Sequence, residues 1–332
     1  TGASGTYFQL EGSGVNGAFL DTNLTSGLVN KFLNNKVPGR YLLLARNGGI
    51  AEAVTPVESQ SLDFGDAPTT AQSSFGTDYP TTTINNGARH TPTGPTLGPN
   101  RDSESDGVPS ANATGDDVAG TDDEDGVTFL TSLVDSSATT TTTASLTVNL
   151  QNPNTILSRD GTANLLDAWI DFNRDGDWLD AGEQIFTNRS LGTTPGLKTL
   201  SFTIPQGTGN VLTGTTYARF RLSIDGGLAP TGQAIDGEVE DYQVTIIADN
   251  AGATATLPAG GGTFTLDVSG GQRRLMQEGT TLFSVVTSAT GALTITGTAA
   301  GNETLQVNFG GGNPIPSDGI TFHGGAGGSD TL

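Results

Sequence analysis

The chain has 332 residues, 48 of them glycine, and only 15% of its residues are charged. Its formal net charge is −21 with 14 Lys and Arg, so nucleic acid and anionic membrane surfaces are poor partners, because phosphates are bound by clustered basic side chains. Cysteine is absent, which excludes disulfides, thiol catalysis and cysteine metal sites. Divalent cations are the partners that so negative a chain attracts.

Short apolar runs separated by glycine-rich turns, with almost no helical periodicity, predict an all-β protein made of β-sandwich domains. We expect four parts: a β-rich unit at 1–60, an acidic strap at 61–127, a β-sandwich at 128–247 and a second β-rich domain at 248–332. No apolar run reaches the roughly 18 residues that suggest a transmembrane helix, so none is expected.

The first unit contains two predicted strands, at residues 5–12 and at Arg40–Ala45, and the second is followed by a predicted turn at 47–49. The unit is too short to bury a full core by itself. We therefore expect either an incomplete domain that packs on a neighbour or a segment that donates a strand to the next subunit.

The acidic strap, residues 61–127, carries nine carboxylates between Asp102 and Asp125 and little apolar periodicity. Such a segment stays disordered or collects cations. Its interspersed aromatic residues favour anchoring, so we expect an extended, ordered strap that links the domains and is held by calcium. The predicted ligands are Asp102, Glu104, Asp106, Asp123 and Asp125. A lone histidine in the strap, His90, is predicted to serve as a hydrogen-bonding residue and not in catalysis.

The β-sandwich at 128–247 is predicted from about seven short strands spaced by turns. Side chains alternate between the two faces of a strand. In the strand at residues 215–224, Arg219 and Arg221 should therefore share one face, while Phe220 and Leu222 face the core.

The stretch Trp169–Glu183 reads WIDFNRDGDWLDAGE, in which oxygen-bearing side chains alternate before a glycine. This spacing is typical of a calcium loop, whose oxygens surround one hard cation. An EF-hand loop has glutamate at its twelfth position, whereas here Gly182 is twelfth and Glu183 follows, and no long helix flanks the loop. We predict a calcium loop of EF-hand type between β-strands; the alternative is an acidic surface turn without metal. The predicted ligands are Asp171, Asn173, Asp175, Asp177 and Glu183, with Trp178 covering the site.

A second acidic cluster, at residues 236–241, holds four carboxylates that repel one another unless a cation or arginines offset them. One interpretation is that Glu238 or Asp241 completes the coordination begun at Asp171. The other is a solvated turn, or ion pairs with Arg219 and Arg221. The sequence leaves both open.

Three stretches of this domain, DFNRDGDWLDAGE, YARFRLS and DGEVEDYQV, resemble the GEVED domain of large bacterial surface and secreted proteins. The resemblance covers roughly Leu146–Ile247, and the GEVED string itself, Gly237–Asp241, is intact. The order DFGDAP, GARH and DDEDGV in the strap resembles the acidic leader that often precedes such domains. The resemblance implies a β-sandwich module in an extracellular multidomain chain and leaves its activity undefined.

The segment 248–332 contains four predicted strands joined by glycine turns. Its last part, GGNPIPSDGITFHGGAGGSDTL, resembles the entry to a glycine-aspartate β-helix repeat of calcium-binding secreted proteins. We expect neither a roll nor a metal site there, because one imperfect copy cannot build such a roll. Arg273 and Arg274 are expected to be a surface pair.

No nucleotide-binding motif, zinc ligand set or convincing Ser-His-Asp set occurs in the sequence, so the chain is not expected to be an enzyme. We expect a non-catalytic, calcium-stabilised extracellular structural protein: a surface-layer, fibre or adhesin component that self-assembles into filaments or joins neighbouring domains of a larger chain. The alternative is a carbohydrate- or protein-binding module of a large secreted enzyme, with Trp178 as the residue that contacts sugar.

Overall fold

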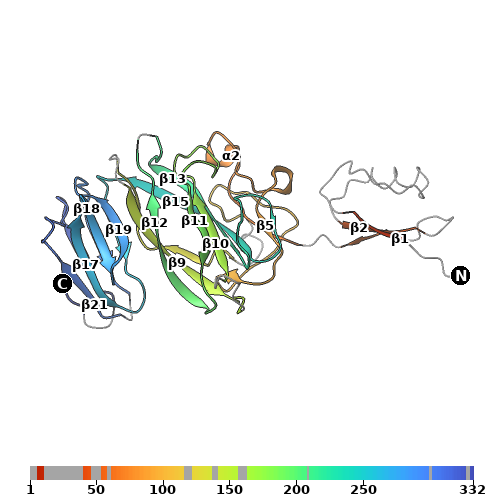
Figure 1. Cartoon of the computed structure of the whole chain (residues 1–332). Helices are drawn as coiled ribbons and strands as arrows, with labels where there is room; N and C mark the ends of the chain where they lie inside the picture. Colours follow the sequence, from red (N-terminus) through yellow and green to blue (C-terminus); the bar gives the residue numbers. More distant parts are fainter. Residues whose placement is uncertain are drawn as a thin grey trace. The chain divides into compact units, whose positions relative to one another are not determined.

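The computed structural model describes residues 6–10, 40–45, 54–57, 61–115, 122–136, 141–155, 163–207, 209–298, 301–326 and 330–332. The chain is almost entirely β, as expected (Figure 1). It divides into two compact units, residues 1–62 with 104–106 and residues 63–103 with 107–332. The described part of the first unit contains three antiparallel strands: β1 (Thr6–Leu10), β2 (Arg40–Ala45) and β3 (Val54–Val57). Both strands predicted there are present, and the predicted turn at 47–49 lies outside the described residues.

The second unit is built around a β-sandwich whose two layers enclose one core. One layer is a five-stranded sheet in the order β11-β10-β13-β15-β8, and the other contains β9 paired with β12, β6 and β7. The strands are β6 (Thr96–Leu97), β7 (Val127–Phe129), β8 (Leu133–Asp135), β9 (Thr142–Gln151), β10 (Leu165–Ile170), β11 (Gln184–Ser190), β12 (Gly196–Ile204), β13 (Gly214–Ser223) and β15 (Glu238–Ala248). The predicted fold class, all-β with a sandwich core, is confirmed.

Strand alternation explains which side chains fill the core. On β13, Phe220 and Leu222 point into the sandwich, as predicted, so Arg219 and Arg221 lie on the opposite face. All these side chains are nevertheless buried, as are all six residues of β10. Another part of the chain, outside the two layers of the sandwich, must therefore cover the outer face of the five-stranded sheet.

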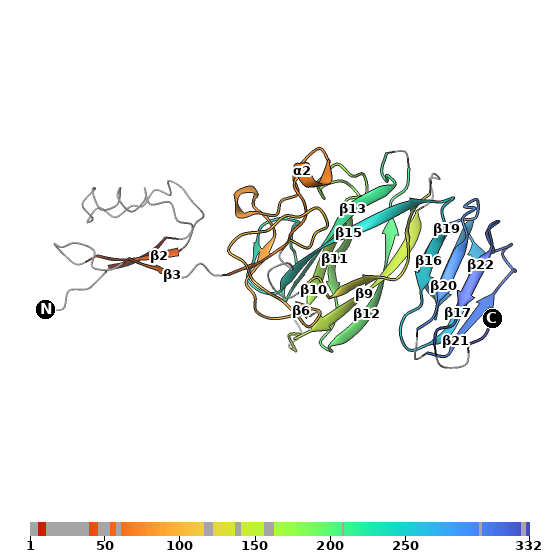
Figure 2. The ribbon, with the colours of Figure 1, turned by 180° about the vertical axis from the view of Figure 1, so that it is seen from behind.

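The part of the chain that covers this face is the acidic strap, which crosses the outer side of the sheet (Figure 2). Tyr79 of the strap packs against Trp178 and Tyr217, with ring centroids 4.4 and 5.4 Å away. The short elements here are β4 (Asp63–Phe64), α2 (Thr70–Ser73), a 3-10 turn (Thr83–Asn85) and β5 (Arg89–His90), which pairs with β14 (Gln233–Ala234). The strap was expected as an extended link between domains; its described part is instead folded onto the sheet, because its aromatic side chains find apolar partners there.

The C-terminal part of the second unit contains a stack of parallel strands, which the sequence did not predict (Figure 2). Parallel pairing joins β16 (Ala253–Thr256), β20 (Leu293–Thr296) and β22 (Ile320–His323), and also β17 (Gly262–Ser269) and β21 (Glu303–Val307). Ala255, Ile295 and Phe322 occupy equivalent positions on adjacent strands. Parallel pairing needs matching positions on successive strands and not copies of one repeat; the absence of a glycine-aspartate roll and of a metal site here stays a prediction.

A hairpin of β18 (Gln272–Gln277) and β19 (Thr280–Val286) extends this part towards the sandwich, where Ser284 pairs with Thr143 of β9. Arg273 was expected on the surface but is buried, and its Nε donates to the carbonyl oxygen of Pro314 at 2.5 Å. Within the described residues, no helix has the length and apolar character needed to cross a membrane.

Candidate metal centres

The loop between β10 and β11, residues 171–183, folds around the carboxylate of Asp171. This side chain is fully buried; its Oδ1 accepts a hydrogen bond from the Arg174 amide at 2.5 Å and its Oδ2 one from the Gly176 amide at 3.0 Å. Gly176 has φ +98°, and a Cβ there would lie 2.5 Å from the carbonyl oxygen of Thr77. The turn that the glycine was predicted to provide is therefore confirmed, and it also makes room for the strap.

Three carboxylates converge within the loop: oxygens of Asp175, Asp177 and Asp180 lie within 4.8 Å of one another. Short turns hold them, since the Asp175 amide donates to Asn173 Oδ1 at 3.0 Å and the Asp177 amide donates to Asp175 Oδ1 at 3.2 Å. The donor set is all oxygen, which fits a hard cation such as calcium. Asp180 was not among the predicted ligands, although its place in the same acidic loop could have suggested it.

Glu183 was predicted to close the coordination of this loop. It is buried at the base of the loop, where its two carboxylate oxygens accept the amides of Phe172 and Asp180 at 3.1 and 3.2 Å. Burial first, and then the charge of Asp171, raises the pKa of Glu183 to about 8. A nearby cation would favour the ionised forms of Glu183 and Asp171, and so offset the free-energy cost of burying their charges. The ligand roles of Asp171, Asn173, Asp175, Asp177 and Glu183 stay predictions.

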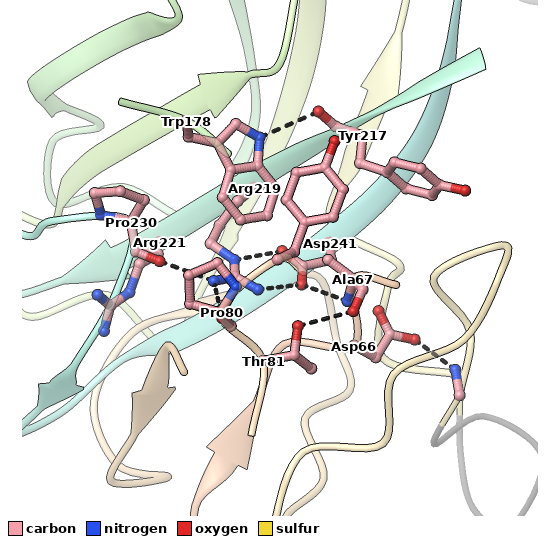
Figure 3. Close-up of polar contacts among 12 residues, drawn as sticks. Asp66, Ala67, Pro80, Thr81, Trp178, Tyr217, Arg219, Arg221, Pro230 and Asp241 are labelled. Carbon is pink, nitrogen blue, oxygen red and sulfur yellow. Dashed lines mark hydrogen bonds and ion pairs between the residues drawn. The ribbon is translucent and has the colours of Figure 1, made fainter. Parts of the chain in front are cut away.

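Asp241 belongs to a different group, a buried ion pair with Arg219 (Figure 3). Arg219 Nε and Nη2 donate to the two oxygens of Asp241 at 2.7 and 2.6 Å, and the Ala67 amide of the strap donates to Oδ2 at 2.8 Å. Both oxygens of Asp241 are thus occupied by donors. Of the two interpretations, the arginine pair holds for Asp241, and its predicted role as a calcium ligand is not supported by its contacts.

The remaining donors of Arg219 tie two loops to the sheet. Its Nη1 donates to the carbonyl oxygens of Pro80 and Pro230 at 2.7 and 2.8 Å, and its guanidinium lies 4.4 Å from the ring centre of Trp178 (Figure 3). Trp178 is itself buried and donates Nε1–H to the Tyr217 carbonyl oxygen at 3.2 Å. Its ring lies over an arginine, and it is not exposed for stacking on a sugar.

Arg221 lies on the same covered face of β13 without a carboxylate partner in hydrogen-bond contact. Its Nη1 donates to the carbonyl oxygens of Ala229 and Thr231 at 2.6 and 2.8 Å, and its Nε donates to His90 Nε2 at 3.0 Å. The other ring nitrogen of His90 therefore carries the proton, which it donates to the Asp236 carbonyl oxygen at 2.7 Å. Burial, followed by the charge of Arg221, holds the pKa of His90 well below its ordinary value. The hydrogen-bonding role predicted for His90 is confirmed.

The predicted ligands of the strap divide between two places. Oxygens of Asp102 and Asp123 lie within 4.8 Å of each other and of Asp63, a residue that the sequence argument missed. Glu104 forms a backbone bridge with Leu62 and, like Asp106, belongs to the first compact unit. The residues of the second unit that gather near Asp63 are Asp102, Asp123, Asp125, Glu238 and Glu240.

Glu238 was predicted to complete the coordination begun at Asp171, but it lies instead beside Asp63 and Glu240, whose charges raise its pKa further after burial. The sequence carried a signal for the missed Glu240. It stands two residues after Glu238 in a strand, so the two side chains share a face. No comparable local signal marks Asp63, which meets β15 only through the fold.

Comparison with known protein families finds one match: residues 165–245 fit the model of the GEVED domain. The matched residues run from the start of β10 into β15 and include the calcium-type loop, both buried arginines and the acidic string. No curated protein and no solved structure matches the chain. The match spans β10, β11, β12 and β13 and most of β15, together with the loop 171–183, so residues 165–245 of the chain are a GEVED domain.

Proposed function

We propose that this chain is a non-catalytic, calcium-stabilised structural module of a bacterial surface or secreted protein, such as a surface layer, fibre or adhesin. The proposal depends on one observation: in the loop 171–183, carboxylate oxygens of Asp175, Asp177 and Asp180 lie within 4.8 Å of one another. Calcium takes six to eight oxygen ligands, and these side chains offer oxygens only. The resemblance to bacterial surface proteins supports the extracellular location.

The position of the loop supports a structural role for the ion. Tyr79 of the strap donates its hydroxyl to Asp171 at 2.5 Å, and the Thr77 amide donates to the Asp175 carbonyl oxygen at 3.2 Å. An ion in the loop would therefore stabilise the packing of the strap as well as the five-stranded sheet. Binding to the folded state alone adds about 2.7 kcal/mol of stability at a ligand concentration a hundredfold above Kd.

The test is thermal unfolding of the purified chain in millimolar calcium and in chelator. We expect calcium to raise the melting temperature of the wild type, and to raise that of the double variant Asp175→Asn/Asp177→Asn less. The matched control is Asp318→Asn, which removes an exposed carboxylate far along the sequence and should respond like the wild type. Equal melting of the wild type with calcium and with chelator would contradict the proposal.

Self-association is a second candidate function, favoured by the outermost parallel strand. Among the described residues β22 pairs with β20 alone, and its inward residues Ile320 and Phe322 are only partly buried. A strand edge of this kind accepts a further strand from another chain or domain. Electron microscopy of the purified chain with and without calcium distinguishes filaments from single particles, and single particles in both conditions would remove this candidate.

A further inference from the structure

The residues that gather near Asp63 form a buried carboxylate cluster at the start of β15. The cluster consists of Asp63, Asp102, Asp123, Asp125, Glu238 and Glu240. They come from four separate stretches: the beginning of the strap, its middle part at Asp102, its end, and the acidic string at residues 236–241. No residue of the loop 171–183 is among them, so this cluster is distinct from the loop site.

Three members of the cluster are almost completely inaccessible: Asp63 and Glu238 are 0% exposed and Glu240 is 1% exposed. Each uses one carboxylate oxygen to accept a backbone amide. The Val239 amide donates to Asp63 Oδ2 at 2.8 Å, the Gly126 amide donates to Glu240 Oε1 at 2.9 Å, and the Leu97 amide donates to Glu238 Oε2. These bonds fix the direction of each carboxylate.

Among the residues that the structure describes, the second oxygen of each of these carboxylates has no hydrogen-bond partner. Asp63 Oδ1, Glu238 Oε1 and Glu240 Oε2 are buried and unpaired, and so are Asp102 Oδ1 and Asp125 Oδ1. A buried polar atom without a partner costs about 1–3 kcal/mol, and more when it is charged. Unpaired oxygens from several segments that all lie in one region are the mark of a missing common partner.

Among the described residues, Arg101 is the basic residue whose charge acts on both Asp63 and Glu238. Its Nη1 donates to the Gly237 carbonyl oxygen at 3.1 Å, and one positive charge does not offset six carboxylates. Protonation is a lesser substitute, because one proton can join at most two of these carboxylate oxygens. A divalent cation among the carboxylates offsets the charge and supplies a partner for several oxygens at once.

We propose that Asp63, Asp102 and Asp123 bind a calcium ion, that Glu238 and Glu240 complete its oxygen shell, and that this ion fastens both ends of the strap to β15. Oxygens of the first three residues already lie within 4.8 Å of one another. The cluster contains no histidine or cysteine, so hard cations are favoured over zinc. The acidic residues of the GEVED string thereby gain separate roles: Glu238 and Glu240 serve the ion, and Asp241 serves Arg219.

This inference extends the proposed function, since both invoke calcium, but it uses a different set of ligands. Isothermal titration of the decalcified chain with calcium chloride separates the two. We expect the wild type to show two binding sites, Asp63→Asn/Asp102→Asn to lose one, and Asp175→Asn/Asp177→Asn to lose the other. The exposed control Asp318→Asn should keep both. If the Asp63 and Asp102 double variant binds as much calcium as the wild type, the cluster is not a site, whatever happens at the loop.

A second signature comes from stability in chelator. Because Asn removes charge repulsion, Asp63→Asn/Asp102→Asn should melt at least as high as the wild type in chelator and should rise less on adding calcium. A double variant that melts lower in chelator and keeps the full calcium response would overturn the inference.

A measurement on the wild type alone covers the case in which the variant does not fold. Hydrogen exchange should slow on calcium binding at the amides of Leu97, Gly126 and Val239, which hold the proposed ligands. At calcium a hundredfold above Kd, exchange through opening of the site should slow on the order of a hundredfold. Unchanged exchange at these amides, with slower exchange at the Gly176 amide of the loop, would show that only the loop binds calcium.

Discussion

Asp241 and Arg219 form an ion pair in which both side chains are completely buried, with Arg219 Nε and Nη2 at 2.7 and 2.6 Å from the two carboxylate oxygens. The pair joins the five-stranded sheet to the strap, because Asp241 also accepts the Ala67 amide and Arg219 also donates to the carbonyl oxygens of Pro80 and Pro230. One carboxylate of the strand and two backbone carbonyl oxygens from two loops thus accept hydrogen bonds from one guanidinium. The packing of the strap depends on this pair as much as on the aromatic side chains.

Replacing Asp241 with asparagine should destabilise the fold strongly. The substitution leaves the Arg219 charge buried without a partner, and breaking a buried pair from one side costs about 3–5 kcal/mol. Denaturant unfolding measures the change. The matched control is Asp267→Asn, which breaks the partly exposed pair of Asp267 with Arg274 and should cost no more than about 1 kcal/mol. Similar losses for the two variants would contradict a structural role for the buried pair.

Trp178→Ala should act on stability. The indole is buried against Tyr79 and Arg219, and removing a buried Trp side chain typically costs about 3–5 kcal/mol. The neighbouring Leu179 is 76% exposed, so Leu179→Ala should change the free energy of unfolding by at most about 0.5 kcal/mol. If Trp178→Ala keeps full stability and instead abolishes glycan binding on an array, the carbohydrate-binding alternative is correct.

The glycine of the GEVED string should not tolerate alanine. Gly237 has φ +88°, and a Cβ there would lie 1.8 Å from the carbonyl oxygen of Leu222. Gly192 has a similar φ of +77° with nothing within 4 Å of its Cβ position, so Gly192→Ala reports the backbone strain alone, about 1–2 kcal/mol. We expect Gly237→Ala to cost about 1–3 kcal/mol more through overpacking. Equal melting temperatures for the two variants would show that β13 moves aside without cost.

Stability should fall in mildly acidic solution because of His90. Its pKa is lowered in the folded state, chiefly by burial, whereas the unfolded chain takes up the proton near the usual value of about 6.5. The unfolded state therefore binds more protons below that value, and stability is lost as the pH falls. Between pH 7.5 and 5.5 the loss from this residue is on the order of 1 kcal/mol.

The measurement is denaturant unfolding at both pH values in saturating calcium, for the wild type and two variants. His90→Gln removes the titrating group and should reduce the drop in stability between the two pH values. His323→Gln changes the other histidine of the chain, which is exposed on β22, and should leave the drop unchanged. A drop of the same size in His90→Gln would assign the pH dependence to carboxylates.

Local patterns were enough to predict much of this protein. Alternation placed Phe220 in the core and Arg219 on the opposite face, and the spacing before Gly176 predicted the turn of the loop. These features depend on residues that are close together in sequence, where the period of a strand or the backbone freedom of a glycine decides the outcome. For the same reason the all-β class and the position of the acidic loop were predictable.

Tertiary structure alone decided which charged groups meet. Asp63 accepts the amide of Val239 from 176 positions away, and Asp241 bonds to Ala67 across 174, so neither partner could be identified from spacing. One interpretation of the sequence was that Glu238 or Asp241 would coordinate the same ion as Asp171. In the structure Asp241 pairs with Arg219, and Glu238 lies beside Asp63 of the strap. Electrostatic partners depend on distance in space, and in a β-protein that distance is set by strand order, which no short stretch of sequence encodes.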